Sequence, residues 1–140
     1  MQRTASAHWE GGLKDGKGTV STASGVLKQT QYSFSTRFEN GAGTNPEELI
    51  AAAHAGCFSM ALSAELGKAG FTPDSIDTSA TLTMDKTDAG FTITAIHLDV
   101  HAKIPNIEAA KFEEIANGAK KGCPVSRVLN ANITMTAHLA

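Results

Sequence analysis

The chain has few cysteines and a small net charge, and each of these features excludes some classes of function. Cys57 and Cys123 are the only cysteines among 140 residues, so a disulfide framework like that of small secreted domains is not expected. Two isolated cysteines point instead to reactive or buried thiols. The net charge of −2 and the lack of a run of basic residues argue against a nucleic acid as the partner.

Targeting signals are missing as well. The first eight residues contain no apolar stretch, so no signal peptide is expected. The one long apolar segment, residues 45–66, is rich in alanine, glycine, serine and histidine, and it lacks the flanks of a membrane span. We therefore expect a cytoplasmic protein that does not enter a membrane.

The chain contains no internal repeat, linker or low-complexity run, so residues 1–140 are expected to form a single domain. Its N-terminal part predicts a three-stranded meander with strands over 4–10, 18–24 and 31–38. The third of these strands alternates aromatic and polar residues with the period of a β-strand.

Residues 45–66 predict a long central helix. Asn45 is a good N-cap, Pro46 suits the first helical position, and Glu48 can reach back as in a capping box. The following residues are almost free of charge on every side, and a helix apolar all round must be buried all round. At 1.5 Å per residue this helix is about 33 Å long.

The C-terminal part predicts two strands joined by a hairpin at Asp88–Gly90, then an amphipathic helix, a shorter helix that starts after Cys123, and a closing strand. The strands and the longer helix cover residues 75–86, 91–103, 108–121 and 132–139. Because strands and helices are grouped rather than strictly alternating, the fold class is α+β. The central helix has more apolar surface than this chain can cover, which predicts an intertwined homodimer.

Two interpretations of Cys57 are open. It is either a small buried hydrophobe or a nucleophile. A thiol has a pKa of about 8.5, and an apolar environment raises it further, so a working thiolate needs a cation nearby. His54, one turn earlier in the helix, and Arg37 are the candidates.

Cys123 lies at a predicted helix start, with Lys120 and Lys121 just upstream, and both features favour a reactive thiolate over a passive cap. A metal site is not expected. His54 and Cys57 have the spacing of two ligands, but zinc normally takes four, and no second pair at short spacing exists.

Several motifs together resemble those of the OsmC/Ohr family. They are the Asn-Pro-Glu helix start, the cysteine ten residues after its first glutamate, and the late Cys-Pro-x-Ser, and they lie within residues 8–11, 16–22, 43–50, 53–62 and 122–126. The resemblance extends over nearly the whole chain. It is closer to the osmotically inducible branch than to the organic hydroperoxide resistance branch, because Glu48, Ile50 and the position of Arg37 match the former.

The resemblance implies a thiol peroxidase that acts as an intertwined homodimer with two sites at the interface. Cys57 would attack the peroxide and become a sulfenic acid, and Cys123 would resolve it to a disulfide. A dithiol reductant, which is of the lipoyl type in the better-known branch of the family, would reopen this disulfide. Arg37 would lower the Cys57 pKa and orient the peroxide, and Glu47 would pair with Arg37. No bound cofactor is implied.

An apolar wall around such a site would favour organic hydroperoxides over hydrogen peroxide, because an alkyl group contributes burial energy. The alternative is a stress-induced binding or structural protein whose thiols are incidental.

The helix also sets a geometric constraint. Glu47 and Cys57 are ten residues apart, about 15 Å along a straight helix, which is too far for one site. Either the helix breaks between them or the partner chain supplies Glu47. We expect each site to take Cys57 and Cys123 from one chain, and Glu47 with Arg37 from the other.

Overall fold

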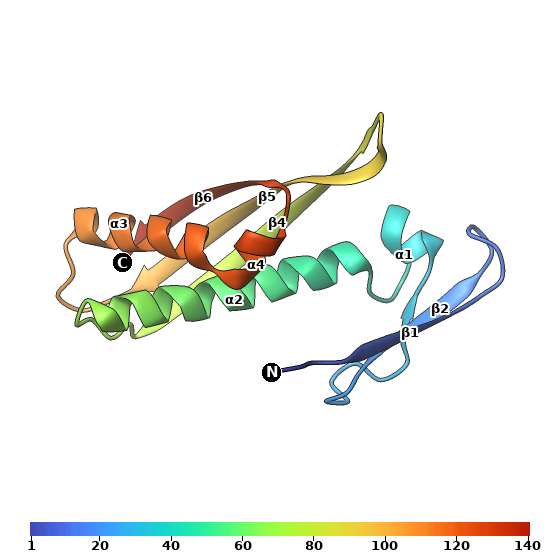
Figure 1. Cartoon of the computed structure of the whole chain (residues 1–140), viewed down its shortest axis with the longest axis horizontal. Helices are drawn as coiled ribbons and strands as arrows, with labels where there is room; N and C mark the ends of the chain where they lie inside the picture. Colours follow the sequence, from blue (N-terminus) through green and yellow to red (C-terminus); the bar gives the residue numbers. More distant parts are fainter. The chain divides into compact units, whose positions relative to one another are not determined.

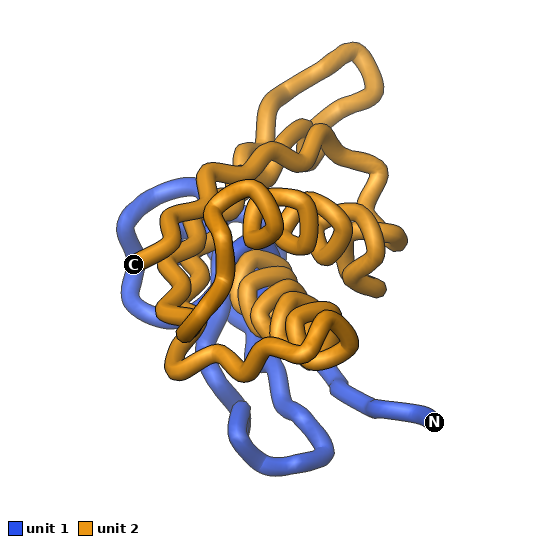
Figure 2. Tube along the Cα trace, turned by 90° about the vertical axis from the view of Figure 1, so that its left-hand side faces the viewer, with its two compact units in different colours: residues 1–49 blue, residues 50–140 orange.

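The computed structural model describes all 140 residues. The elements in chain order are β1 (Ala5–Glu10), β2 (Lys17–Thr22), β3 (Thr30–Tyr32), α1 (Phe34–Phe38), α2 (Pro46–Lys68), β4 (Ser75–Thr87), β5 (Gly90–Lys103), α3 (Ala109–Gly122), α4 (Pro124–Val128) and β6 (Asn132–Leu139) (Figure 1). Helices and strands are grouped as expected, which confirms the α+β class. The chain forms two compact units, residues 1–49 and 50–140, coloured separately in Figure 2. That all 140 residues act as one domain stays a prediction.

The first unit contains the predicted meander, an antiparallel sheet in the order β1-β2-β3. Its aromatic pair, Trp9 and Tyr32, packs with ring centroids 5.4 Å apart. A Cβ on Gly18 would lie 2.6 Å from the Trp9 ring and 2.5 Å from the Tyr32 ring. Only glycine therefore allows the two rings to close over β2.

The predicted third strand over 31–38 is wrong in its second half. β3 ends at Tyr32, and α1 follows. Ser33 and Thr36 form a capping box, in which the Ser33 N–H donates to Thr36 Oγ1 at 2.8 Å and the Thr36 N–H donates to Ser33 Oγ at 3.3 Å. Phe34 and Phe38 fit a strand's alternation, but their spacing is also one helical turn, and their rings lie 4.9 Å apart in α1.

The start of α2 is capped as predicted by Asn45, whose Oδ1 accepts the Glu48 N–H at 2.7 Å. Glu48 does not complete the capping box in the predicted way. Its Oε2 instead accepts a hydrogen bond from the Thr44 hydroxyl at 2.7 Å. The Asn45 side-chain amide donates to the Thr36 carbonyl at 2.9 Å, which fixes α1 against the start of α2.

The second unit is built on the sheet β4-β5-β6. β4 and β5 form the predicted hairpin, and β6 returns parallel to β5. Alternate residues of β5 are completely or almost completely buried: Ile96, Leu98, Val100 and Ala102. The residues between them, which include His97, Asp99 and His101, therefore lie on the opposite face of the sheet.

Helices α2 and α3 cover the apolar face of this sheet (Figure 1). The core combines Phe58, Leu62 and Leu66 of α2 with Phe112, Ala116 and Ala119 of α3. Burying a leucine such as Leu62 stabilises the fold by about 2 kcal/mol. In α3 the predicted burial of Phe112 and Ala119 is confirmed, whereas Ile115 is half-buried and Ala116 takes the central position.

The remaining face of α2 is not covered by this chain. Only four of its 23 residues are buried, and Met60 on the uncovered face is 77% exposed. By length and composition α2 would suffice to cross a membrane, but a helix from the core of a soluble protein meets the same test. The uncovered face is what the predicted homodimer requires, and the dimer stays a prediction.

Candidate active site

The two thiols meet inside the second unit. Cys57 lies in the middle of α2 and Cys123 lies between α3 and α4, 66 residues later, with the two sulfurs 2.9 Å apart in a hydrogen bond. Cys123 is completely buried, whereas Cys57 is partly exposed, and both are free thiols. A disulfide of about 2.05 Å would need the sulfurs to approach by less than about 1 Å. Cys57 is therefore the thiol that an incoming molecule can reach, and Cys123 is placed to bond with it.

The Cys-Pro dipeptide explains how Cys123 comes to face α2. The Cys123 N–H still bonds to the Ala119 carbonyl at 2.9 Å and closes α3, but its ψ of 128° leaves the helical region. Residues before proline avoid the helical conformation, and Pro124 then starts α4 at its first position. The chain bends at Cys123, and its side chain points into the core next to Cys57.

The environment of Cys57 acts against a thiolate. Burial raises the pKa of Cys57, and its contact with Cys123 adds to the rise. One group acts in the opposite direction, because a hydrogen bond from the Val125 backbone N–H lowers the pKa of Cys57. The net shift is upward, so Cys57 needs a further positive group to work at neutral pH.

His54 is not that group. It is completely buried, and its Nε2 is hydrogen-bonded to Ser126 Oγ at 2.7 Å. Burial lowers the pKa of His54 below its ordinary value of 6.5, so the ring is neutral at pH 7. His54 is therefore excluded as the cation that stabilises a Cys57 thiolate, and Arg37 remains as the candidate.

Arg37 and Glu47 are paired within the first unit. Arg37 lies in the last turn of α1, and its Nε and Nη2 lie 2.8 and 2.7 Å from the same oxygen, Glu47 Oε1. The Glu47 carboxylate is only 13% exposed, and its Oε2 has no partner. Arg37 also lies over the Phe38 ring, 5.3 Å from the centroid. These two contacts hold the guanidinium in place. Its third nitrogen, Nη1, forms no hydrogen bond with Glu47.

The helix between the two groups is unbroken. α2 runs without interruption from Pro46 to Lys68, so a break between Glu47 and Cys57 is ruled out. The two residues therefore lie about 15 Å apart along the α2 axis.

Two features of the site were not found from the sequence. One is the hydrogen bond between His54 and Ser126. The sequence does contain a pattern that could have indicated it, because His54 lies three residues before Cys57 and Ser126 lies three residues after Cys123. The other is the Val125 N–H, a backbone donor, and side-chain patterns give no sign of such a group.

The sequence matches one protein family and is similar to two named relatives. The OsmC-like protein family matches residues 39–138. The chain is 60% identical over 139 residues to peroxiredoxin OsmC of Escherichia coli (strain K12), with 99% of this chain and 97% of that protein covered. It is 32% identical over 123 residues to the organic hydroperoxide resistance protein OhrB of Bacillus subtilis (strain 168), with 87% and 88% covered.

The fold is shared with solved structures. The crystal structure of OhrB from Bacillus subtilis aligns with a TM-score of 0.65 at 27% identity, over 98% of both chains. An OsmC-like protein from Vibrio cholerae aligns with a TM-score of 0.77 over 98% and 99% of the chains, at an identity of 15% that supports likeness of fold alone. The extent of these matches, together with the two facing thiols, shows that this chain belongs to the OsmC-like protein family.

Proposed function

We propose that this chain is a thiol-dependent peroxidase that reduces organic hydroperoxides in defence against oxidative and osmotic stress. Its class, a cysteine-based peroxidase, follows from relatives named peroxiredoxin OsmC and organic hydroperoxide resistance protein. The observation that carries the proposed mechanism is the 2.9 Å separation of a partly exposed Cys57 sulfur and a buried Cys123 sulfur.

The reaction has two steps in this chain. The Cys57 thiolate attacks the peroxide oxygen farther from the alkyl group, the O–O bond breaks, and the leaving alkoxide takes a proton to become an alcohol. Cys57 is oxidised to a sulfenic acid. The Cys123 thiolate then attacks the Cys57 sulfur, the S–O bond breaks, and the departing hydroxide becomes water. An external dithiol such as a lipoyl group supplies the two electrons that reopen the disulfide, which suits the reducing cytoplasm.

Arg37 supplies the missing positive charge in this proposal. The raised Cys57 pKa and the neutral His54 leave a need for a cation, and Glu47 holds the Arg37 guanidinium in position. Because α2 is unbroken, the Arg37–Glu47 pair of one chain serves Cys57 of a partner chain. The enzyme is then an intertwined homodimer whose uncovered α2 faces pack together, with the whole chain as one OsmC-like domain.

The substrate preference follows from the surroundings of Cys57. It is packed at the edge of the core cluster, beside Phe58 and Ala61 of α2 and Val125 of α4. Each buried CH₂ of a substrate contributes about 0.8 kcal/mol, which hydrogen peroxide cannot supply. Organic hydroperoxides are therefore the better substrates.

Steady-state reduction of an organic hydroperoxide and of hydrogen peroxide, with a dithiol as reductant, tests the proposal. The parent chain should turn over, faster with the organic substrate, and Cys57→Ser should abolish turnover. Cys123→Ser should consume about one equivalent of peroxide per chain and then stall or become overoxidised. Turnover by Cys57→Ser at the parent rate would refute the mechanism, and an inactive parent chain would favour a binding protein with incidental thiols.

A further inference from the structure

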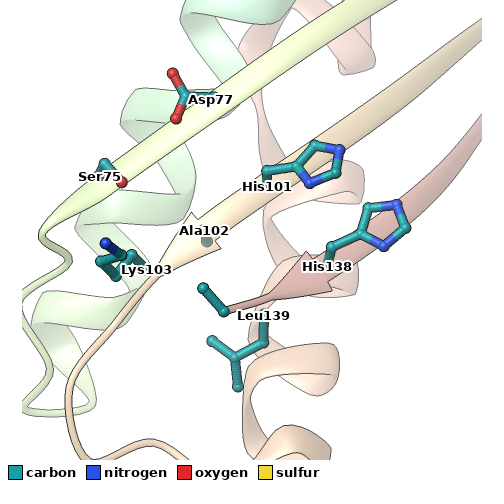
Figure 3. Close-up of a pocket in the computed structure, with 8 residues that line it drawn as sticks. Ser75, Asp77, His101, Ala102, Lys103, His138 and Leu139 are labelled. Carbon is teal, nitrogen blue, oxygen red and sulfur yellow. The ribbon is translucent and has the colours of Figure 1, made fainter.

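The second unit has a group of histidines on the sheet face opposite the thiols. Alternation along β5 turns His97, Asp99 and His101 away from the core, and the parallel register sets His138 of β6 beside His101. Figure 3 shows the His101 and His138 rings next to each other on neighbouring strands, at the pocket by the ends of β5 and β6. The two side chains are 61% and 49% exposed.

Three of these side chains converge. Asp99 Oδ1 lies 3.2 Å from His138 Nε2 and 3.5 Å from His101 Nε2, and all three ligand atoms lie within 4.8 Å of one another. Ligands bound tetrahedrally at 2.0–2.2 Å from a zinc ion are about 3.3–3.6 Å apart. The two nitrogen–oxygen separations therefore already match a common metal ion.

The Asp99 carboxylate is directed towards both imidazoles. Asp99 Oδ1 is shielded from solvent and forms no well-aligned hydrogen bond with either imidazole, although the Asp99 side chain as a whole is 46% exposed. The third histidine of this face behaves differently, because Thr134 and Thr136 hydroxyls engage both His97 nitrogens at 2.7 and 3.2 Å.

We propose that Asp99, His101 and His138 bind one divalent transition-metal ion of the Zn²⁺, Ni²⁺ or Cu²⁺ class. Two imidazoles and one carboxylate are a ligand set suited to these ions, and a water would complete the coordination. The rings are stacked at 14° with centroids 4.3 Å apart, so they must tilt to direct both nitrogens at one ion, and their exposure permits this movement.

The charges beside the site are mixed. Asp77 of β4 pairs with His101 in register and adds a negative charge, whereas Lys103 lines the same pocket with a positive one (Figure 3). Among the three proposed ligands, Asp99 contributes the one carboxylate that would offset part of the charge of a dication. The thiols lie among the helices packed on the core face of the sheet, and the proposed metal site lies on the other face, so the proposal does not depend on the peroxidase mechanism.

Binding of Zn²⁺ to the full-length chain, measured by calorimetry after chelator treatment, tests the proposal. The neighbouring thiols are themselves zinc ligands, so the measurement uses the Cys57→Ser/Cys123→Ser variant. We expect one ion per chain. Adding Asp99→Asn or His138→Gln should weaken the affinity by at least about tenfold, whereas the matched His97→Gln on the same face should not.

A Cu²⁺ spectrum provides the second measurement. Electron paramagnetic resonance of the thiol-free variant should show coupling to two imidazole nitrogens, and His138→Gln should reduce this to one. Because His138 is half-exposed, that variant should fold even if Asp99→Asn does not. Absence of stoichiometric binding, equal weakening by His97→Gln, or unchanged binding in both Asp99→Asn and His138→Gln would overturn the proposal.

Discussion

His54 and Ser126 form a buried hydrogen bond, 2.7 Å long, between α2, which carries Cys57, and α4, which follows Cys123. His54 lies in α2 one turn before Cys57, and Ser126 lies in α4 three residues after Cys123. The bond therefore holds α4 against α2 close to both sulfurs. Its function would be to keep the resolving thiol within reach while Cys57 carries the sulfenic acid.

Replacing Ser126 tests this. Ser126→Ala should lower the free energy of unfolding by about 1–3 kcal/mol, because the buried His54 Nε2 loses its partner. Disulfide formation after one equivalent of peroxide should slow, as followed by loss of free thiols. The exposed Ser79→Ala on β4 is the control and should change neither quantity. If Ser126→Ala forms the disulfide at the parent rate, the bond has no positioning role.

The stability of the chain should depend on the protonation of His54. Its folded pKa is lowered by burial, so the unfolded chain binds a proton below pH 6.5 that the folded chain does not. The contribution of neutral His54 to the free energy of unfolding is thus complete above pH 6.5, and it falls as the pH drops towards the pKa of His54 in the folded chain.

Urea unfolding at pH 7.5 and pH 5.5 measures the effect. The parent should lose more stability between these pH values than His54→Gln, which keeps a side chain able to bond with Ser126 but cannot titrate. Equal losses in the two proteins would show that His54 is not held neutral by burial.

Arg37→Met should raise the pKa of Cys57, because it removes the proposed cation beside a thiolate that burial already disfavours. Alkylation of Cys57 at neutral pH should slow about tenfold for each unit by which the pKa rises. Arg3→Met, which removes an exposed positive charge from the same unit, is the control. An unchanged alkylation rate in Arg37→Met would assign the activation of Cys57 to another group.

The uncovered face of α2 should form the dimer interface. Met60→Glu places a charge at the centre of this face, so it should dissociate the dimer and abolish activity while the isolated chain stays folded. Light scattering after size exclusion and circular dichroism measure the two properties. Val128→Glu, at a residue that is 76% exposed on α4, should stay dimeric. A dimeric, active Met60→Glu would place the interface elsewhere.

Elements with strong local signals could be predicted from the sequence. The cap at Asn45 and Pro46, the two-residue hairpin loop before Gly90 and the break at Cys123–Pro124 determine where chain segments start and end. α1 was missed because the spacing of Phe34 and Phe38 fits a strand and a helix equally well, and the capping side chains of Ser33 and Thr36 decide between them.

The candidate site depended less on local signals. The proximity of Cys57 and Cys123 across 66 residues and the pairing of Arg37 with Glu47 came from the family resemblance, since spacing alone left the role of Cys57 open. The neutral state of His54 could not be foreseen, because it results from packing against a segment 72 residues away. The proposed metal ligands could not be foreseen either, because the register between β5 and β6 that brings them together is a tertiary feature.

Complementation between two inactive variants tests the shared site most directly. Cys57→Ser lacks the attacking thiol, and Glu47→Ala lacks the carboxylate that holds Arg37. In a mixed dimer, Cys57 of the Glu47→Ala chain meets Arg37 and Glu47 of the Cys57→Ser chain, so one of the two sites is intact. Random co-refolding of equal amounts makes half of the dimers mixed and should therefore restore about a quarter of the parent activity. No recovered activity, in a sample where mixed dimers have been demonstrated, would contradict the shared site.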